Sequence, residues 1–301
     1  SFGFIEAGQC ARDFINVEVG KLRDYLKEAR ANKDADKRSL KQIEDKILTM
    51  ETRLRELEHG LNHDSDRIIT WDELGIDALF VDEAHEFKNL YTPSMMNVPG
   101  VPNGDAKRAM DMRIKTWDIR TRGGKVVFAT GTPILNSVGE AFIMQTFLAE
   151  ELLAERGIAM FDAWARTFAK VVPVFEMTPD GGGFRVNSRL ARFVNMPELF
   201  GMWFQFTFSR SREQLGLPTP ALMDGKRIGV SIPASPRLTA FVKDCVERVE
   251  AIKAGDVKPW EDNMLCVVND AGKAALDTRL VMGGVRVADV EEINDEADEA
   301  A

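Results

Sequence analysis

The chain has 301 residues, of which 45% are hydrophobic and 29% charged, and its formal net charge is −9. This length and apolar content predict a chain of about two domains that is globular at least in part, and exclude one that is disordered throughout. No apolar run approaches the roughly 20 residues of a membrane-spanning helix, and the first residues lack a signal peptide's basic start and cleavage site, so we expect a cytoplasmic protein.

Two long amphipathic helices are predicted at the start of the chain. Between residues 15 and 29, and again between residues 40 and 61, apolar residues recur at steps of three and four, the period of a helix with one buried face. The polar stretch 32–38 separates them, so we predict an antiparallel helical hairpin over residues 1–68. A spacer or docking arm is the simpler interpretation, and binding of a specific partner is the alternative.

The period changes after the hairpin. Residues 78–81 and 125–129 are short runs of β-forming apolar residues that each end in a polar turn, as expected of buried parallel strands. Residues 106–121 between them have helical spacing, which completes a strand–helix–strand unit of the α/β class. We assign residues 69–155 to this α/β domain and expect its functional loops at the carboxyl ends of the strands.

The remaining residues, 156–287, are predicted to be mainly helical. Residues 141–153 before them form an apolar helix, and residues 236–254 an amphipathic one. A glycine-rich stretch at 179–183 indicates a hairpin or an exposed loop. The run that contains Trp203, Phe204, Phe206 and Phe208 is interpreted as core or as an interface with further domains.

Residues 288–301 form an acidic tail. They hold seven acidic residues and no basic one, so the rest of the chain carries a net charge of only −2. We predict that this tail is disordered, because it is too polar to be buried and its like charges repel one another. The three cysteines, Cys10, Cys245 and Cys266, lack metal-ligand spacing, and we interpret them as ordinary buried thiols.

The first strand ends in the sequence Asp82-Glu83-Ala84-His85, which has the form of a Walker B strand followed by a DEAH box. A carboxylate at a strand end, such as Asp82, can hold magnesium through its water shell. The adjacent Glu83 can orient and deprotonate the water that attacks a γ-phosphate. His85 is expected to face neighbouring segments, and the alternative is a capped turn with solvated acids. The candidate catalytic residues are Asp82, Glu83 and His85, with Asp82 also the metal ligand.

The second strand is followed by Thr130-Gly131-Thr132-Pro133-Ile134-Leu135-Asn136-Ser137. This segment resembles the third motif of superfamily-two helicases, and with Glu140 after it is similar to the version found in the chromatin-remodeller (switch/sucrose non-fermenting) branch. The resemblance implies a partial RecA-like sheet and an inserted hairpin. It also implies that hydroxyls here couple the nucleotide site to a second motor domain. The candidate coupling residues are Thr130, Gly131, Thr132 and Asn136.

Later segments are similar to large phage- and plasmid-borne helicases, some of which are antirestriction proteins or are fused to an adenine DNA methylase. The similar segments are residues 161–164, 192–199, 217–220, 262–265 and 272–280. This resemblance covers nearly the whole chain. It implies ATP and magnesium as cofactors of the full-length protein, and DNA, the missing motor domains and a methylase domain as partners.

A phosphate-binding loop of the form Gly-x-x-x-x-Gly-Lys-Ser/Thr is absent from the sequence. Gly123-Gly124-Lys125 precedes a strand and lacks the spacing, and Gly181-Gly182-Gly183 is followed by Phe184. Together with the start at Ser1 rather than Met, this indicates an internal piece of a longer motor. We expect the isolated chain to bind no ATP and to hydrolyse none.

The basic stretch between the two motifs is the candidate contact with a DNA backbone. A motor that walks binds phosphates without reading sequence, so scattered basic side chains suffice, and a solvated helix face is the alternative. The candidates are Lys107, Arg108, Arg113, Lys115, Arg120 and Arg122. A second basic cluster at residues 184–193 is either a further nucleic-acid contact or a helix that packs its aromatic side into the core.

Two classes of function remain open at this point. The first is an ATP-dependent DNA helicase or translocase, to which this chain contributes the water-activating acids and the coupling motif. The second is a non-catalytic interaction module of a phage or plasmid DNA-modification complex, in which the hairpin and the aromatic run dock a partner.

Overall fold

The computed structural model describes residues 8–31, 36–60, 70–177, 184–216, 218, 229 and 231–281. The predicted turns at residues 32–35 and 179–183 and the acidic tail at residues 288–301 lie outside the described residues. The chain divides into two compact units. One contains Ser1–Val174 and Asn187–Ser211, and the other contains Phe175–Val186 and Arg212–Ala301.

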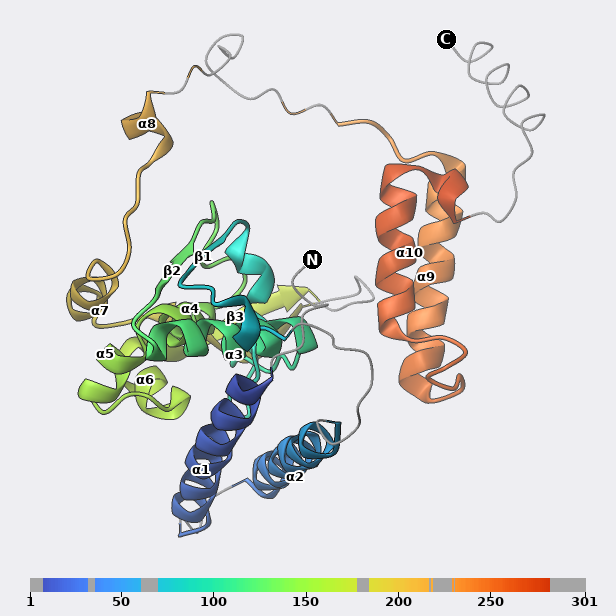
Figure 1. The fold of residues 1–301 in the computed structure, drawn as a ribbon. Helices are drawn as coiled ribbons and strands as arrows, with labels where there is room; N and C mark the ends of the chain where they lie inside the picture. The colour runs from blue at the N-terminus through green and yellow to red at the C-terminus, as the bar shows by residue number, and fades with distance from the viewer. Residues whose placement is uncertain are drawn as a thin grey trace. The chain divides into compact units, whose positions relative to one another are not determined.

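The first unit is a mixed α/β structure (Figure 1). Its elements are α1 (Gln9–Ala31), α2 (Lys37–Gly60), η2 (Asp72–Leu74), β1 (Ala78–Val81), η3 (Ala84–Phe87), α3 (Lys107–Thr121), β2 (Lys125–Phe128), α4 (Gly139–Leu148), α5 (Glu150–Glu155), α6 (Phe161–Phe168) and α7 (Met196–Trp203). The strands β3 (Ala169–Met177) and β4 (Phe184–Phe193) form a two-stranded antiparallel sheet whose residues are divided between the two units.

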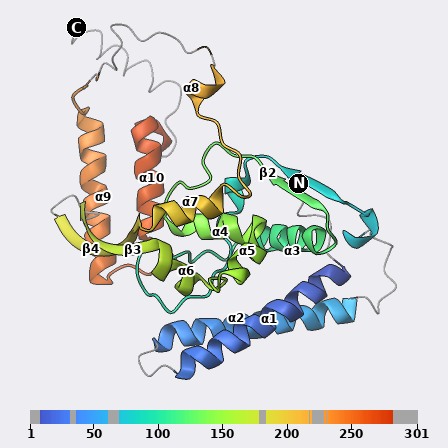
Figure 2. The same ribbon diagram turned by 90° about the vertical axis from the view of Figure 1, so that its left-hand side faces the viewer.

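The predicted helical hairpin is confirmed. The helices α1 and α2 lie side by side in both ribbon views (Figures 1 and 2). Arg23 pairs with Glu51 and Arg30 pairs with Glu44, each at 2.5 Å. Because the residue numbers rise along α1 as they fall along α2, the two helices are antiparallel.

The hairpin shares its hydrophobic core with the sheet. The Phe14 ring of α1 meets the Trp117 ring of α3 edge-on at 5.6 Å, and the Arg113 guanidinium lies over the same Phe14 ring. Buried residues of both hairpin helices, α3 and β1 belong to one cluster, and the partly buried Val126 and Phe128 of β2 pack against it. The hairpin is therefore packed into the first unit, and its apolar stripe is largely used inside it.

The strands β1 and β2 are parallel and in register, from Ala78 opposite Lys125 to Val81 opposite Phe128. This confirms the two predicted strands. Leu79 and Val81 are buried on the side that α3 covers. On the other side, Phe80 and its cross-strand partner Val127 are 73% and 44% exposed. Sheets of parallel strands are normally covered on both faces, so this sheet has one face bare within the described residues.

A second hydrophobic cluster joins α4, α6, α7 and β4. The helix predicted over residues 141–153 is wrong in its continuity, because Ala149 adopts φ −146° and divides it into α4 and α5. Glu150, the first residue of α5, forms ion pairs with Lys21 and Arg113. The break in the helix therefore lies directly before a residue whose ion-pair partners are distant in sequence and cannot be predicted from the local pattern.

Asp162 links three parts of the first unit. Its carboxylate is 6% exposed and accepts hydrogen bonds from the Tyr25 hydroxyl at 2.7 Å, the Ser94 hydroxyl at 2.5 Å and the Met95 backbone N–H at 2.9 Å. Tyr25 belongs to α1 and Asp162 to α6. The carboxylate therefore joins the hairpin, the loop after η3 and α6.

The stretch 184–193 is a strand rather than the helix considered above. Leu190 of β4 is buried and its N–H donates to the Pro99 carbonyl at 2.8 Å, whereas Arg185 and Arg192 are exposed. Pairing with β3 overrides the helical interpretation. Sheet contacts depend on residues distant in sequence, so a short mixed stretch is ambiguous from its own pattern.

The second unit is mainly helical, as predicted. It contains α8 (Arg212–Leu215), α9 (Pro236–Ala254), α10 (Met264–Leu276) and η5 (Thr278–Leu280). The helices α9 and α10 lie side by side (Figures 1 and 2). Arg248 of α9 binds both oxygens of Asp262, at 2.6 and 2.9 Å, and reaches Asp270 of α10 at 3.2 Å.

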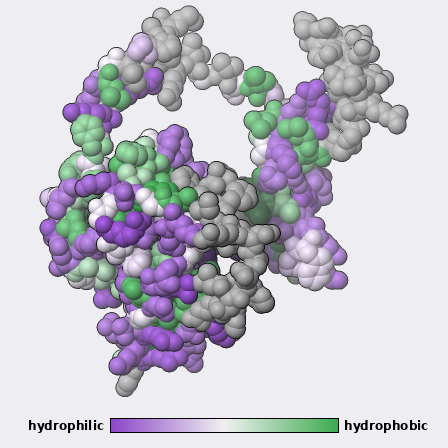
Figure 3. Space-filling view, viewed as in Figure 1, coloured by the Kyte–Doolittle hydropathy of each residue, from purple (hydrophilic) through white to green (hydrophobic). Residues whose placement is uncertain are grey.

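Hydrophilic residues dominate the face seen in Figure 3, where hydrophobic residues appear as separate patches. Among the described residues, every helix is too short or too polar to span a lipid bilayer.

Candidate functional site

The two motifs lie side by side at one end of the parallel sheet. Asp82 and Glu83 follow β1, and Thr130 follows β2. Backbone hydrogen bonds continue past the strands, because the Ala129 N–H donates to the Val81 carbonyl at 2.8 Å and the Ala84 N–H donates to the Ala129 carbonyl at 3.1 Å. The expected meeting of the two carboxyl-terminal turns is therefore observed.

The backbone of Glu83 adopts a left-handed conformation, with φ 50° and ψ 44°. A residue with a β-carbon reaches this region at a cost of about 1 kcal/mol or more. The Asp82 carboxylate accepts a hydrogen bond from the Glu83 N–H at 2.9 Å, which helps to hold the turn. Both acids are exposed, with 65% of the Glu83 side chain open to solvent. Their oxygens are the hard ligands that suit a hydrated magnesium ion.

His85 connects the acids to the coupling turn. Its Nδ1 lies 2.9 Å from the Thr130 hydroxyl and 3.2 Å from a Glu83 carboxylate oxygen. The Thr130 hydroxyl also accepts a hydrogen bond from the Thr132 N–H at 3.1 Å. The side chain thus faces a neighbouring segment, as the sequence predicts. The same imidazole nitrogen is therefore close to both the Glu83 carboxylate and the turn that carries Thr130.

Glu140 organises the remainder of the coupling loop. This carboxylate is 7% exposed and accepts hydrogen bonds from the backbone N–H groups of Leu135 at 2.6 Å and Asn136 at 3.1 Å. Its other oxygen pairs with Lys88 at 3.3 Å. Gly131, Thr132 and Asn136 are exposed beside this anchor. The loop is therefore fixed at its base and open along its outer edge.

Lys88 is a site residue that sequence reasoning missed. It lies at the end of η3, where its N–H donates to the His85 carbonyl at 3.2 Å, and its side chain is only 15% exposed. Through Glu140 it ties the turn that carries the acids to the coupling loop. The only signal for it in the sequence is its place three residues after His85.

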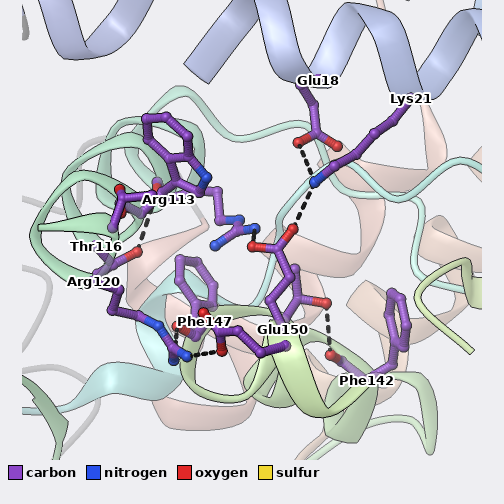
Figure 4. A network of polar contacts seen from close by, with 12 residues as sticks. Glu18, Lys21, Arg113, Thr116, Arg120, Phe142, Phe147 and Glu150 are labelled. Atoms are coloured by element: carbon purple, nitrogen blue, oxygen red, sulfur yellow. Dashed lines mark hydrogen bonds and ion pairs between the residues drawn. The ribbon is translucent and has the colours of Figure 1, made fainter. Parts of the chain in front are cut away.

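Two of the six basic candidates are buried inside the first unit. Arg113 and Lys115 are 3% and 0% exposed. Arg113 pairs with Glu150 (Figure 4), and Lys115 pairs with Asp111 at 2.7 Å. These two side chains are unavailable to a phosphate backbone. Both residues are basic, as the sequence shows, but they are not on a free surface. The helix α3 lies between α1 and the sheet, so both of its sides are covered.

Arg120 and Arg122 hold the end of α3. Arg120 pairs with Glu151 and donates to the Phe147 carbonyl at 3.1 Å. Arg122 pairs with Asp118 at 2.7 Å. Of the six candidates, Lys107, Arg108 and Arg122 are exposed, and Arg108 pairs on the surface with Glu86 at 2.9 Å. The structure therefore leaves three exposed basic side chains for the predicted contact, two of them already in ion pairs, rather than a continuous stripe.

A comparison with family models decides the family. The model described as "Probable helicase domain" matches residues 2–211, which is most of the chain and includes both motifs. The chain belongs to this family of probable helicase domains. The match ends at the residue where the first unit ends, Ser211. No curated protein and no solved structure matches the chain.

One further cluster in the helicase domain has ligand-like chemistry. The Cys10 sulfur and carboxylate oxygens of Asp72 and Asp118 lie within 4.8 Å of one another. Burial and the hydrogen bond to Asp72 raise the pKa of the Cys10 thiol, and Asp118 already binds Arg122 and the Trp71 indole N–H. The cluster serves as a hydrogen-bonded anchor.

Of the other cysteines, Cys245 is half-buried and Cys266 is exposed, so the prediction of burial is wrong for Cys266.

The charge network around Glu150 makes the helicase domain sensitive to acid. Burial opposes the charge of Glu150, but Arg113 and Lys21 together hold the pKa of its carboxyl below the ordinary 4.5. Figure 4 shows Lys21 of α1 and Arg113 of α3 reaching the same carboxylate. A carboxyl whose pKa is lower in the folded than in the unfolded state stabilises the fold fully at any pH above its unfolded-state pKa. This stability is lost as the pH falls from there through the folded-state pKa.

We therefore expect Glu150→Gln to lower the free energy of unfolding by about 2 kcal/mol at pH 7. The difference from the parent should shrink as the pH falls below about 4.5, because the unfolded parent then binds a proton that its folded carboxylate does not yet take up. Urea denaturation at a series of pH values measures both effects. A difference that stays constant down to pH 3 would contradict the assignment of charge to this network.

Proposed function

We propose that this helicase domain is part of an ATP-driven nucleic-acid motor of the chromatin-remodeller-like branch of superfamily two. In this proposal Asp82 holds magnesium through water, and Glu83 orients and deprotonates the attacking water. His85 and Thr130 pass the state of the site to the coupling loop. The observation that carries the proposal is the position of the His85 Nδ1, within 3.2 Å of both the Glu83 carboxylate and the Thr130 hydroxyl.

The chemistry follows the standard requirements of phosphoryl transfer. Bound magnesium would neutralise charge on the phosphates. In this proposal the exposed Glu83 would serve as the base and the exposed Asp82 would hold the magnesium ion, while Glu140 with Lys88 fixes the loop beside them. Both acids follow the carboxyl end of β1, and α/β proteins place their ligands at the carboxyl ends of their parallel strands.

The proposal also requires further polypeptide. The sequence holds no phosphate-binding loop, and the bare sheet face with Phe80 and Val127 is apolar surface of the kind that another part of a parallel α/β domain covers. We propose that additional sequence of the same protein supplies both the loop and this cover. A second motor domain would complete the site.

Equilibrium binding of magnesium and ATP tests this requirement. The 301-residue chain should show no measurable binding, and a longer polypeptide that includes the residues encoded upstream should bind and hydrolyse ATP. If the longer polypeptide neither binds nor hydrolyses ATP, the motor proposal fails. The non-catalytic interaction module would then be the better interpretation.

A further inference from the structure

The two hydrophobic clusters of the helicase domain meet around a cavity. Its volume is about 140 Å³, close to the roughly 150 Å³ of an apolar cavity that takes up benzene. The lining includes residues of every helix from α1 to α6, so both hairpin helices form part of it. Its apolar walls come from both clusters and are at most 5% exposed: Phe14, Leu22, Leu90, Phe142, Leu153 and Phe161.

The cavity opens to solvent near the end of α5. Ala154 of α5 and Ala159 in the segment after it line the cavity, and both are exposed. We call these two residues the entrance. Their side chains are single methyl groups, which leave the way to the buried walls open. A small ligand therefore reaches the apolar walls without unfolding of the domain.

The polar side of the cavity is balanced in charge. Two acids and two bases line it, namely Glu18, Glu150, Lys21 and Arg113. Lys21 lies 2.6 Å from Glu150 and 3.6 Å from Glu18, and Arg113 pairs with the other oxygen of Glu150 (Figure 4). Because these charges already neutralise one another, a charged ligand would lose its hydration without gaining a new partner. The cavity therefore favours an uncharged ligand.

Glu150 can still accept a hydrogen bond from a ligand. An ionised carboxylate offers about four lone-pair positions, and Lys21 donates to its Oε1 while Arg113 donates to its Oε2. A ligand hydroxyl can use a remaining position on either oxygen. On the apolar side, the rings of Phe142 and Phe161 meet edge-on at 5.4 Å, and a further aromatic ring gains from contacts of this kind.

We propose that this cavity binds a small uncharged aromatic alcohol of about the size of phenol. The ring packs against the phenylalanine side chains, and the hydroxyl donates to Glu150. Because the walls come from the hairpin and from α3 to α6, a bound ligand strengthens the attachment of the hairpin to the rest of the helicase domain. The proposal rests on the volume, the rings and the charge balance of the cavity, and is independent of the proposed motor function.

Titration of the full 301-residue chain with phenol tests the site. Ligand-observed NMR should show saturable binding with a dissociation constant of about 1 mM or lower, as for an efficient ligand of so few atoms. About 5 mM phenol should then raise the thermal unfolding midpoint by about 3 °C. Benzene should bind about tenfold more weakly, because it donates no hydrogen bond to Glu150. Benzoate should bind at least about tenfold more weakly, because its charge is not compensated.

Two substitutions at the entrance locate the binding. Ala154→Phe and Ala159→Phe each place a ring in the opening and should abolish the binding of phenol. Both residues are exposed, so the fold has room for the larger side chain. Ala240→Phe is the matched control, since Ala240 is an exposed alanine of α9 that does not line the cavity. This variant should bind phenol as the parent does.

Three results would overturn the inference. The first is phenol binding that is absent or does not saturate below about 10 mM. The second is binding that both entrance variants retain, or that Ala240→Phe loses to the same extent as they do. The third is benzoate binding that is tighter than phenol binding. A thermal melt without phenol shows whether each variant is folded. The two entrance residues lie in different segments, so one folded entrance variant is sufficient for the comparison.

Discussion

Replacement of Glu83 by Gln should lower ATP hydrolysis by the longer polypeptide about a hundredfold or more, because the amide cannot accept the proton of the attacking water. Affinity for ATP should change little, since Glu83 is assigned to the water rather than to the phosphates. Steady-state hydrolysis and nucleotide binding, measured on the same preparation, separate the two effects. Glutamine has almost the same size and can keep a hydrogen bond to His85, so the turn should be preserved.

Glu86→Gln provides the matched control for this experiment. Glu86 is an exposed acid of the same turn that pairs with Arg108 at 2.9 Å and lies 3.8 Å from the His85 Nε2, on the side of the ring opposite the nitrogen that faces Glu83 and Thr130. Its replacement removes the same charge from the same neighbourhood. Hydrolysis should therefore stay within about twofold of the parent, as for a loss of surface charge. Equal losses in the two variants would point to a general charge effect and would count against Glu83 as the base.

Removal of the Asp162 carboxylate should cause the largest loss of stability from a single polar side chain. In Asp162→Ala, the Tyr25 hydroxyl, the Ser94 hydroxyl and the Met95 N–H all lose their acceptor. Unpaired buried donors cost about 1 to 3 kcal/mol each. We expect the free energy of unfolding of the first unit to fall by about 3 kcal/mol, allowing for partial access of water.

Urea denaturation followed by tryptophan fluorescence measures this loss, since Trp71 and Trp164 are buried in the first unit. Tyr25→Phe removes one donor and leaves the carboxylate two partners, so it should cost about 1 kcal/mol. Asp45→Ala, on the exposed side of α2, should change stability by less than about 0.5 kcal/mol. An Asp162→Ala variant as stable as Asp45→Ala would show that the three hydrogen bonds do not anchor the hairpin.

Local periodicity was sufficient to predict the elements that place the site. The hairpin helices and α9 each have one clear apolar stripe, and β1 and β2 are short β-forming runs between polar turns. Parallel strands bring their carboxyl ends together, so the proximity of the turns that carry Glu83 and Thr130 also followed from the sequence. The chemical roles of these residues remain predictions.

Features that depend on distant partners could not be predicted. Arg113 is neutralised by Glu150, which lies 37 residues away, so a helix that seemed basic is internal to the fold. The break at Ala149 carries no glycine or proline signal. Lys88 acquires its role only because Glu140 reaches it across the loop. In each case the contact that decides the structure joins residues too far apart in sequence for a local pattern to connect them.

The shared core of the hairpin has a mechanical consequence. Phe14 and Lys21 attach α1 to α3 and to Glu150, and α3 leads directly into β2, whose end carries Thr130. A displacement of the hairpin would therefore be passed through α1 and α3 to β2, the strand that leads to the Thr130 hydroxyl beside His85.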